Sequence, residues 1–259
     1  MQLKDHVAVI TGAGRGIGRA IALAYAQEGA NLVLAARSTE ALEETRMLVE
    51  KLGSEALVVP TDVQLEDNVQ NLVQQTIKHF GKVDVLVNNS GITGPSAPLW
   101  EVAPQDWAET FAVNVTGTYL CCRGFLPHMI ERRSGSVIMI GSVAGKRPLL
   151  GRTPYASSKM AMVGMARTLA WETGPYGIRV NVISPGPVEG ERIEWVIGKQ
   201  AEVRGISVEQ ARHQFTRDSP LGRLIPPDDI ASAALFLASD LSRSITGEDL
   251  NVCAGIVMY

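Results

Sequence analysis

Seven short runs of apolar, mostly β-branched residues recur along the chain, and longer segments with helical patterning separate them. The runs comprise residues 7–11, 31–36, 56–60, 83–88, 136–141, 178–184 and 249–252. Most of them are apolar at nearly every position, which indicates strands that are buried on both faces, as in a parallel sheet. The alternation therefore predicts an α/β fold with a doubly wound parallel sheet and right-handed crossovers.

The segments between the runs predict helices, and their ends carry stop signals. The expected helices comprise residues 17–28, 39–52, 65–79, 104–132, 154–173 and 227–238. Gly29, Gly53 and Gly81 follow three of them, where a helix C-terminus favours a residue without a Cβ. No repeat or flexible linker divides the chain. We therefore expect one Rossmann-type domain over residues 1–259, with helices on both faces of about seven strands.

The segment 189–217 interrupts this alternation. It is charged and helical in pattern, and a doubly wound sheet does not require it. Insertions near the carboxyl ends of strands often cover a binding site, so the segment is interpreted as a substrate lid. A solvated pair of surface helices is the alternative.

Composition excludes several classes of function. A net charge of −3 gives no electrostatic reason to expect nucleic acid or an anionic membrane as a partner. Cys121, Cys122 and Cys253 form no C-x-x-C motif and no even disulfide framework, which suits a reducing compartment. The four histidines are scattered without metal-ligand spacing, so no metal is expected. The first apolar run is too short for a signal peptide, and no window is apolar enough to span a membrane, so we expect a cytoplasmic protein.

The stretch TGAGRGIG at 11–18 follows the first predicted strand and opens the first predicted helix. Glycines let the backbone turn tightly and approach a phosphate, and the helix N-terminus supplies free N–H groups. The spacing is Gly12-x-x-x-Gly16-x-Gly18, which differs from G-x-G-x-x-G. In this context the turn predicts a dinucleotide site.

The end of the second predicted strand indicates which dinucleotide binds. A free ribose 2′-hydroxyl is usually held by an acidic residue near this point, but the chain has Ala36 and Arg37 there. A guanidinium accepts a 2′-phosphate, and Arg15 supplies a second cation. The residues favour NADP, with NAD as the alternative. Arg37 as a merely solvated charge is the competing interpretation.

The stretch YASSK places Tyr155 and Lys159 four residues apart, on one face of a predicted helix. Such pairs are common by chance, so the spacing alone decides little. Physical chemistry shows what the pair is able to do: a nearby ammonium favours the phenolate and lowers the pKa of a phenol, whose usual value is about 10.

Taken together, the motifs resemble the short-chain dehydrogenase/reductase family, in its branch of about 250 residues. The resemblance rests on motifs that appear in the family's order and spacing from Thr11 to the last strand. Besides the glycine turn they are DV at 62–63, NNSG at 88–91, FAVNVTG around Asn114, GS at Ser142, the Tyr155/Lys159 pair and PGPV at 185–188.

The resemblance implies an NAD(P)-dependent oxidoreductase that interconverts an alcohol with a ketone or aldehyde by hydride transfer. It implies that Tyr155 is the general acid/base and that Lys159 holds the nicotinamide ribose. It also implies that Ser142 hydrogen-bonds the substrate oxygen, and that Asn114 kinks its helix and holds a water of the proton relay.

The same resemblance implies the residues that contact the cofactor. Asp62 and Val63 are expected at the adenine and Val188 at the carboxamide. The alternatives are that Asp62 caps the third helix and that Val188 only packs in the core. The full set comprises Gly12, Gly14, Arg15, Gly16, Ile17, Gly18, Arg37, Asp62, Val63, Asn88, Tyr155, Lys159 and Val188.

Three departures from the family pattern concern specificity and assembly. Ser90 stands where alanine is usual, and Cys253 and Ala254 stand where NVDGG is commoner. Substrate choice is expected in 92–100, 144–153 and 189–217. Lys146, Arg147 and Arg152 either attract an acidic substrate or lie in solvent, and solvent is favoured.

The family pattern also implies a homodimer or homotetramer, through helices at 104–132 and 154–173. Two other functions stay open beside an enzyme that acts on a small alcohol or carbonyl substrate. One is a non-catalytic dinucleotide-binding sensor or scaffold on the same fold. The other is an epimerase or dehydratase, which tends to have a longer chain with a separate substrate domain.

Overall fold

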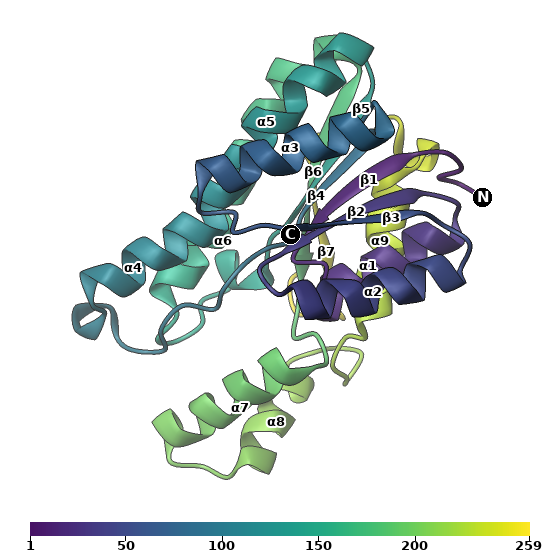
Figure 1. The fold of residues 1–259 in the computed structure, drawn as a ribbon. Coiled ribbons are helices and arrows are strands. Elements are labelled where there is room, and N and C mark those ends of the chain that lie inside the picture. Colours follow the sequence, from purple (N-terminus) through teal and green to yellow (C-terminus); the bar gives the residue numbers. More distant parts are fainter.

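The centre of the protein is a seven-stranded parallel sheet (Figure 1). The computed structural model describes residues 1–259, apart from the side chain of Val203. The strands lie in the order β3-β2-β1-β4-β5-β6-β7, so the direction of winding reverses between β1 and β4. Their bounds are β1 (Val7–Thr11), β2 (Asn31–Ala36), β3 (Ala56–Pro60), β4 (Val85–Asn88), β5 (Gly135–Ile140), β6 (Ile178–Pro185) and β7 (Asp249–Val252).

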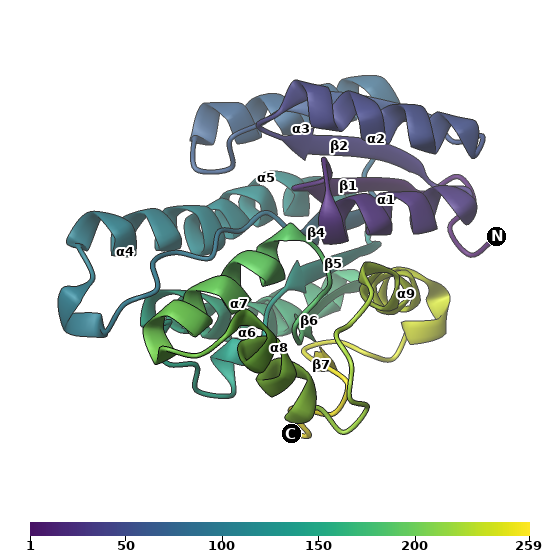
Figure 2. The same ribbon diagram turned by 90° about the horizontal axis from the view of Figure 1, so that it is seen from below.

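Helices cover both faces of the sheet, and each face has its own apolar core. Helices α1, α2 and α9 pack on one face, and α3, α5 and α6 pack on the other (Figures 1 and 2). The α-helices are α1 (Gly16–Gln27), α2 (Thr39–Lys51), α3 (Glu66–Phe80), α4 (Pro104–Phe111), α5 (Gly117–Arg132), α6 (Thr153–Thr173), α7 (Glu191–Arg204), α8 (Val208–Arg217) and α9 (Pro227–Ala238). Short 3-10 turns lie at η1 (Leu99–Glu101), η3 (Val143–Gly145), η4 (Gly174–Tyr176) and η5 (Asp240–Ser242).

The predicted doubly wound fold is confirmed, and most boundaries agree within two residues. The expected single helix over 104–132 is wrong in its detail. A π-helical turn, η2 (Ala112–Thr116), separates α4 from α5 and carries Asn114. A π-turn inserts one extra residue into the helical repeat, which redirects the side chains there and often marks a functional site.

Helices α7 and α8 form a pair that stands beyond the carboxyl ends of the strands (Figure 1). The pair has a small apolar core of its own, which comprises Ile193, Ile197, Ala201 and Ala211. A parallel bridge between Val188 and Ile225 joins the two connections that link the pair to the sheet. The insertion expected at 189–217 is therefore a helical hairpin at the edge where doubly wound folds bind ligands.

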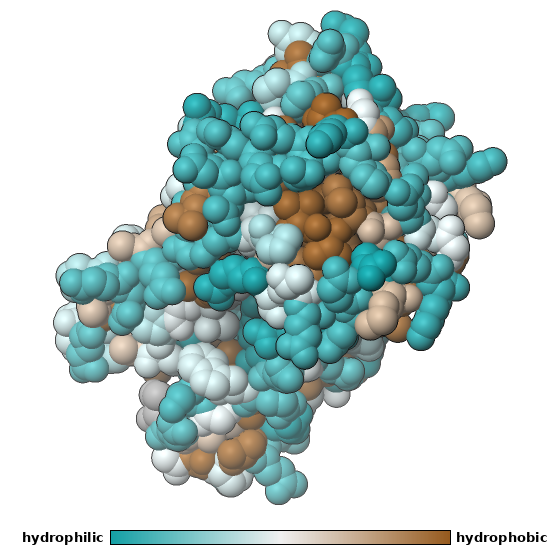
Figure 3. Space-filling view, viewed as in Figure 1, coloured by the Kyte–Doolittle hydropathy of each residue, from teal (hydrophilic) through white to brown (hydrophobic). Residues whose placement is uncertain are grey.

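The face shown in Figure 3 is mostly hydrophilic, with an apolar area between α2 and α3 over the edge strand β3. Leu57 of this strand is partly buried against the core. None of the helices in the described part of the chain combines the length and the apolar character that a bilayer crossing needs.

Candidate active site

The turn after β1 has a backbone that favours glycine. Gly12 and Gly16 have φ angles of +67° and +54°, in the left-handed region. A Cβ on Gly18 would overlap the carbonyl oxygen of Gly12, so this position admits no side chain. Helix α1 then begins without a side-chain cap and without an acidic residue in its first turn. Its free N–H groups and positive end form a cradle that fits the pyrophosphate of a dinucleotide.

The other residues expected in this turn have different surroundings. A Cβ on Gly14 would lie 3.0 Å from the Cβ of Ala41, so this glycine allows α2 to approach the turn. Ile17 is partly buried and packs against the core. Arg15 is exposed, and its guanidinium lies 3.1 Å from the carboxylate of Glu191 at the start of α7. The glycine turn therefore contacts the α7–α8 hairpin.

Two side chains that the sequence reasoning missed hold the turn in place. Arg19 donates to the carbonyl oxygen of Gly14 and forms an ion pair of 2.7 Å with Glu44. Asn89 donates to the carbonyl oxygens of Thr11 and Gly12, at 2.9 and 3.2 Å. The position of Asn89 within NNSG, directly after an apolar run, is a signal that points to this role.

The residues expected near the adenine follow β2 and β3. Arg37 lies at the exposed end of β2 and forms no ion pair among the described residues, so its charge is available to a ligand. The carboxylate of Asp62 accepts hydrogen bonds from the backbone and side chain of Gln64, at 3.1 and 3.3 Å. Helix α3 begins only at Glu66, so the alternative that Asp62 caps this helix is wrong. Val63 is buried, 2.6 Å from where a Cβ on Gly117 would lie.

The remaining cofactor candidates lie at the carboxyl ends of β4 and β6. The side chain of Asn88 is buried and donates to the Sγ of Cys122 at 3.5 Å. Its Oδ1 accepts no hydrogen bond within the described part of the chain. Val188 is half-buried beside Ile225.

Tyr155 and Lys159 lie one turn apart on α6, as their spacing predicts. Lys159 Nζ lies 5.7 Å from the centre of the Tyr155 ring and donates to the carbonyl oxygen of Ile140 at 2.7 Å. The ammonium is buried and forms no ion pair with a carboxylate among the described residues. Burial, with a smaller contribution from the nearby charge of Arg192, lowers the pKa of Lys159 to about 7.

Asn114 connects the π-turn to the loop after β4 and to α6. Its Oδ1 accepts from the backbone N–H of Ile92 at 2.8 Å, and its Nδ2 donates to the Ile92 carbonyl oxygen and to Ser158 Oγ, each at 3.0 Å. A Cβ on Gly91 would lie 3.2 Å from Asn114 Oδ1 and 3.4 Å from Lys159 Nζ. The two side chains therefore converge on one backbone position.

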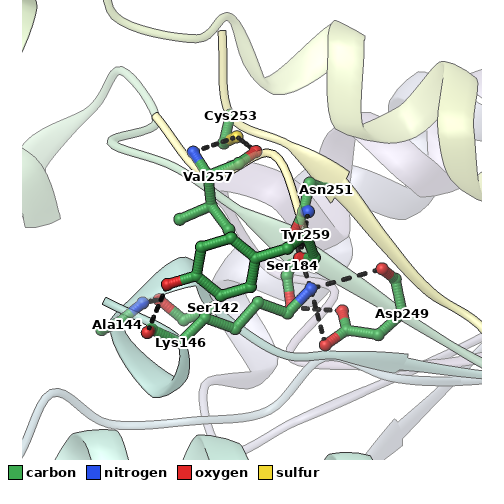
Figure 4. A network of polar contacts seen from close by, with 9 residues as sticks. All are labelled: Ser142, Ala144, Lys146, Ser184, Asp249, Asn251, Cys253, Val257 and Tyr259. Carbon is green, nitrogen blue, oxygen red and sulfur yellow. Dashed lines mark hydrogen bonds and ion pairs between the residues drawn. The ribbon is translucent and has the colours of Figure 1, made fainter. Parts of the chain in front are cut away.

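Ser142 caps the 3-10 turn η3 after β5, since its Oγ accepts from the backbone N–H of Ala144 at 3.1 Å. Because this contact uses a lone pair, the hydroxyl proton is available for a substrate oxygen. The loop is anchored by Lys146, whose Nζ lies 2.8 Å from the Asp249 carboxylate and 2.6 Å from Asn251 Oδ1 (Figure 4). Ser184 Oγ donates to the same carboxylate at 2.6 Å.

The expectation that three cations after β5 lie in solvent is wrong for two of them. Lys146 is in the buried ion pair just described. Arg152 is 2 % exposed because it donates to the carbonyl oxygens of Thr93 and Pro95 and packs over the Tyr155 ring. Arg147 is partly exposed and forms an ion pair of 2.7 Å with Asp218.

The chain matches a family model described as enoyl-(acyl carrier protein) reductase over residues 12–257. It is 35% identical to the 3-oxoacyl-[acyl-carrier-protein] reductase FabG of Thermotoga maritima, over all of both chains. It is 36% identical to the (2S)-[(R)-hydroxy(phenyl)methyl]succinyl-CoA dehydrogenase subunit BbsD of Thauera aromatica, over all of this chain and 99% of that one.

The chain is also similar in structure to solved dehydrogenases and reductases. An NAD+-bound xylitol dehydrogenase superposes with a TM-score of 0.96 at 32% identity, over 98% of this chain and all of that one. A variant of actinorhodin polyketide ketoreductase with NADPH superposes with a TM-score of 0.95 at 32% identity, over 98% of each chain.

Proposed function

The chain belongs to the short-chain dehydrogenase/reductase family of oxidoreductases, and we propose that it interconverts an alcohol with a ketone or aldehyde, with NADP(H) preferred. The observation that carries this proposal is the convergence of Tyr155, Lys159 and Asn114 beside the loop of Ser142. A dinucleotide in the glycine cradle would supply the hydride in reduction and accept it in oxidation, while the protein positions the substrate and controls the proton.

The proton is handled at the phenol oxygen of Tyr155. When Lys159 is charged, its ammonium places a positive charge beside the phenol, 5.7 Å from the centre of the Tyr155 ring. Ser142 donates a hydrogen bond to the substrate oxygen, where charge changes during the reaction. Tyr155 then gives the proton to that oxygen in reduction, or accepts it in oxidation.

Lys159 and Asn114 support this step. The ammonium of Lys159 is fixed by the carbonyl oxygen of Ile140, at the end of the strand that precedes Ser142. Asn114 is held from both ends of its amide by Ile92, and in our proposal its π-turn positions a water that relays the proton from Lys159.

The preference for NADP rests on Arg37. Its guanidinium lies at the exposed end of β2 without an acidic neighbour in an ion pair, where the ribose of a bound dinucleotide is expected. A fork of N–H donors suits a 2′-phosphate, which a carboxylate would repel. Arg15 supports the preference less, since its charge is paired with Glu191.

We also propose that residues 189–217 act as a lid. Glu191 contacts Arg15 of the glycine turn, and Arg192 donates to the carbonyl oxygen of Gly91 at 2.9 Å. Both contacts lie on the surface, so they are easily exchanged for contacts with ligands. Assembly into a dimer or tetramer through α4, α5 and α6 fits the exposure of Trp107, Tyr119 and Trp171 on these helices.

The test is nicotinamide absorbance with a panel of ketones, aldehydes and alcohols, offered with NADP(H) and with NAD(H). We expect turnover that prefers NADP(H) and that falls at least about 1,000-fold in Tyr155→Phe, which keeps the ring but has no ionisable proton. Cofactor binding measured by fluorescence serves as the control. Cofactor binding without any turnover would contradict the proposal and favour a dinucleotide sensor.

A further inference from the structure

A buried guanidinium lies against the Tyr155 ring, and none of the carboxylates in the described part of the chain forms an ion pair with it. The Cζ of Arg152 is 5.3 Å from the ring centre, and the residue is 2 % exposed. Two of its nitrogens donate to backbone carbonyl oxygens of the loop after β4, but its Nε has no partner among the described residues. A buried charge without a counterion is costly unless a ligand supplies one.

A second cation approaches the same place from the lid. Arg192 donates to the carbonyl oxygen of Gly91, next to the position where Asn114 and Lys159 converge. Burial lowers the pKa of both Arg152 and Lys159; Tyr155 opposes the lowering for Arg152, and the charge of Arg192 adds to it in each case. Two cations therefore lie beside the Tyr155 ring and a third approaches the neighbouring Gly91, and none of the three forms an ion pair among the described residues.

A cofactor phosphate is not the natural partner of Arg152. The glycine cradle that fits the pyrophosphate is at the start of α1 and is held by Arg19, Asn89 and Thr11. Arg152 instead lies directly before α6, three residues before Tyr155, and its hydrogen-bond partners lie in the loop 92–100, where substrate contacts are expected.

We propose that Arg152, assisted by Arg192 of the lid, binds a carboxylate of the substrate beside the reacting carbon. The inference rests on the proposed oxidoreductase function and names its substrate class: short oxo acids and the matching hydroxy acids. Arg152 carries specificity, and Arg192 strengthens the anion site when the lid is closed. Arg147 has no part in it, because its charge is paired with Asp218.

The competing interpretation is that Arg152 is only a clamp for the loop 92–100. A clamp would act through its two carbonyl contacts and would affect every substrate alike. The positive charge of the side chain at position 152 would matter only if this side chain binds an anion. Arg152→Lys keeps the charge but loses the planar fork, whereas Arg152→Gln keeps hydrogen-bond donors but has no charge, so the two variants separate these roles.

The experiment compares 2-oxo, 3-oxo and 4-oxo acids with their methyl esters, in the wild type and in Arg152→Gln, Arg152→Lys, Arg192→Gln and Arg147→Gln. We expect at least one acid to exceed its ester in kcat/KM for the wild type. Arg152→Gln should lower this ratio about 10- to 100-fold, mainly through KM, as expected for the loss of a charge-assisted contact. Arg152→Lys should retain part of the preference, Arg192→Gln should lose less, and Arg147→Gln should keep the wild-type ratio.

A second readout does not depend on turnover. The same oxo acids, added with NADP+, should raise the Tm of the wild type but not that of Arg152→Gln. Turnover of esters or neutral ketones without preference for an acid would overturn the inference and leave the proposed function intact. Equal losses for acid and ester in Arg152→Gln and Arg152→Lys would establish the clamp instead. Absence of turnover together with absence of a shift in Tm would overturn both.

Discussion

Two lysines that follow Ser142 in the chain, the half-buried Lys146 and the buried Lys159, have opposite electrostatic surroundings. Lys146, on the loop after β5, lies 2.8 Å from the Asp249 carboxylate and also donates to Asn251 (Figure 4). Lys159, on α6, donates to the carbonyl oxygen of Ile140, lies beside the Tyr155 ring and forms no ion pair with a carboxylate among the described residues. The first charge is compensated within the fold. The second is not, and burial lowers its pKa to about 7.

This difference distinguishes a lysine that stabilises the fold from a lysine that serves the proposed reaction. A paired charge holds the Ser142 loop to β6 and β7 and needs no ligand. An unpaired charge makes the folded protein less stable and is retained where a ligand or a reacting group supplies the missing anion. The face of the site that Arg152, Lys159 and Arg192 form is therefore the face expected to receive anions.

Removal of the Lys146 charge should lower the stability of the protein, whereas removal of the Lys159 charge should not. Lys146→Met leaves the Asp249 carboxylate buried without its cation, so the free energy of unfolding should fall by about 3–5 kcal/mol. Lys159→Met removes a buried charge that has no counterion, so at pH 6 the stability of the protein without ligand should stay equal or rise. Urea denaturation measures both variants.

A double variant provides the control for this prediction. Lys146→Met with Asp249→Leu removes both charges and should recover most of the loss, since replacing both partners of a buried pair is often close to neutral. A loss below about 1 kcal/mol in Lys146→Met alone would contradict the comparison of the two lysines.

The pH dependence of stability sharpens the same comparison. Lys159 has a folded pKa of about 7 against an ordinary value of 10.5. Below pH 7 both states hold the proton, and between pH 7 and 10.5 only the unfolded chain holds it. The free energy of unfolding should therefore rise with pH in this window by about 2–4 kcal/mol relative to Lys159→Met. A flat difference between the two proteins from about pH 6 to about pH 10 would contradict this result.

The sheet could be predicted from the sequence because its strands are apolar at nearly every position. This pattern is visible within each strand and does not depend on which strands lie beside it. The glycine turn and the Tyr155/Lys159 pair are equally local. What the sequence did not reveal depends on contacts between distant segments. Asp249 is 103 residues from Lys146, so nothing near either residue indicates the ion pair.

The burial of Arg152 was missed for the same reason. Arginine is ordinarily exposed, and only the folded loop 92–100 supplies the carbonyl oxygens that cover it. The π-turn at Asn114 is also invisible in the pattern of apolar residues, since its side chain bonds to Ile92 from another segment. Contacts between segments that are distant in the sequence could therefore be identified only from the structure.

Arg37, which follows β2 where the cofactor ribose is expected, is a further cation without an ion pair among the described residues, and it is exposed. Ala36→Asp combined with Arg37→Ala should lower the ratio of kcat/KM with NADP to that with NAD about 10- to 100-fold, because a carboxylate replaces a guanidinium at the expected 2′-phosphate position. Arg15→Ala should change the ratio less, since Glu191 already pairs with that charge. An unchanged ratio in the double substitution would show that Arg37 is only a solvated charge.

The smallest expected effect is on stability and concerns backbone strain at Ala254, after β7. Ala254 follows β7 with φ +51°, in the left-handed region that favours glycine, and its carbonyl oxygen accepts from Ser219 Oγ at 2.9 Å. Ala254→Gly should relieve this strain and raise the free energy of unfolding by about 1 kcal/mol, net of glycine's greater freedom in the unfolded chain. Thermal unfolding measures the gain. Because the carbonyl oxygen of Ala254 contacts Ser219 and Leu221 and none of the three cations, the preference between acid and ester should stay constant while Tm rises. A change in that preference would show that the two regions are coupled.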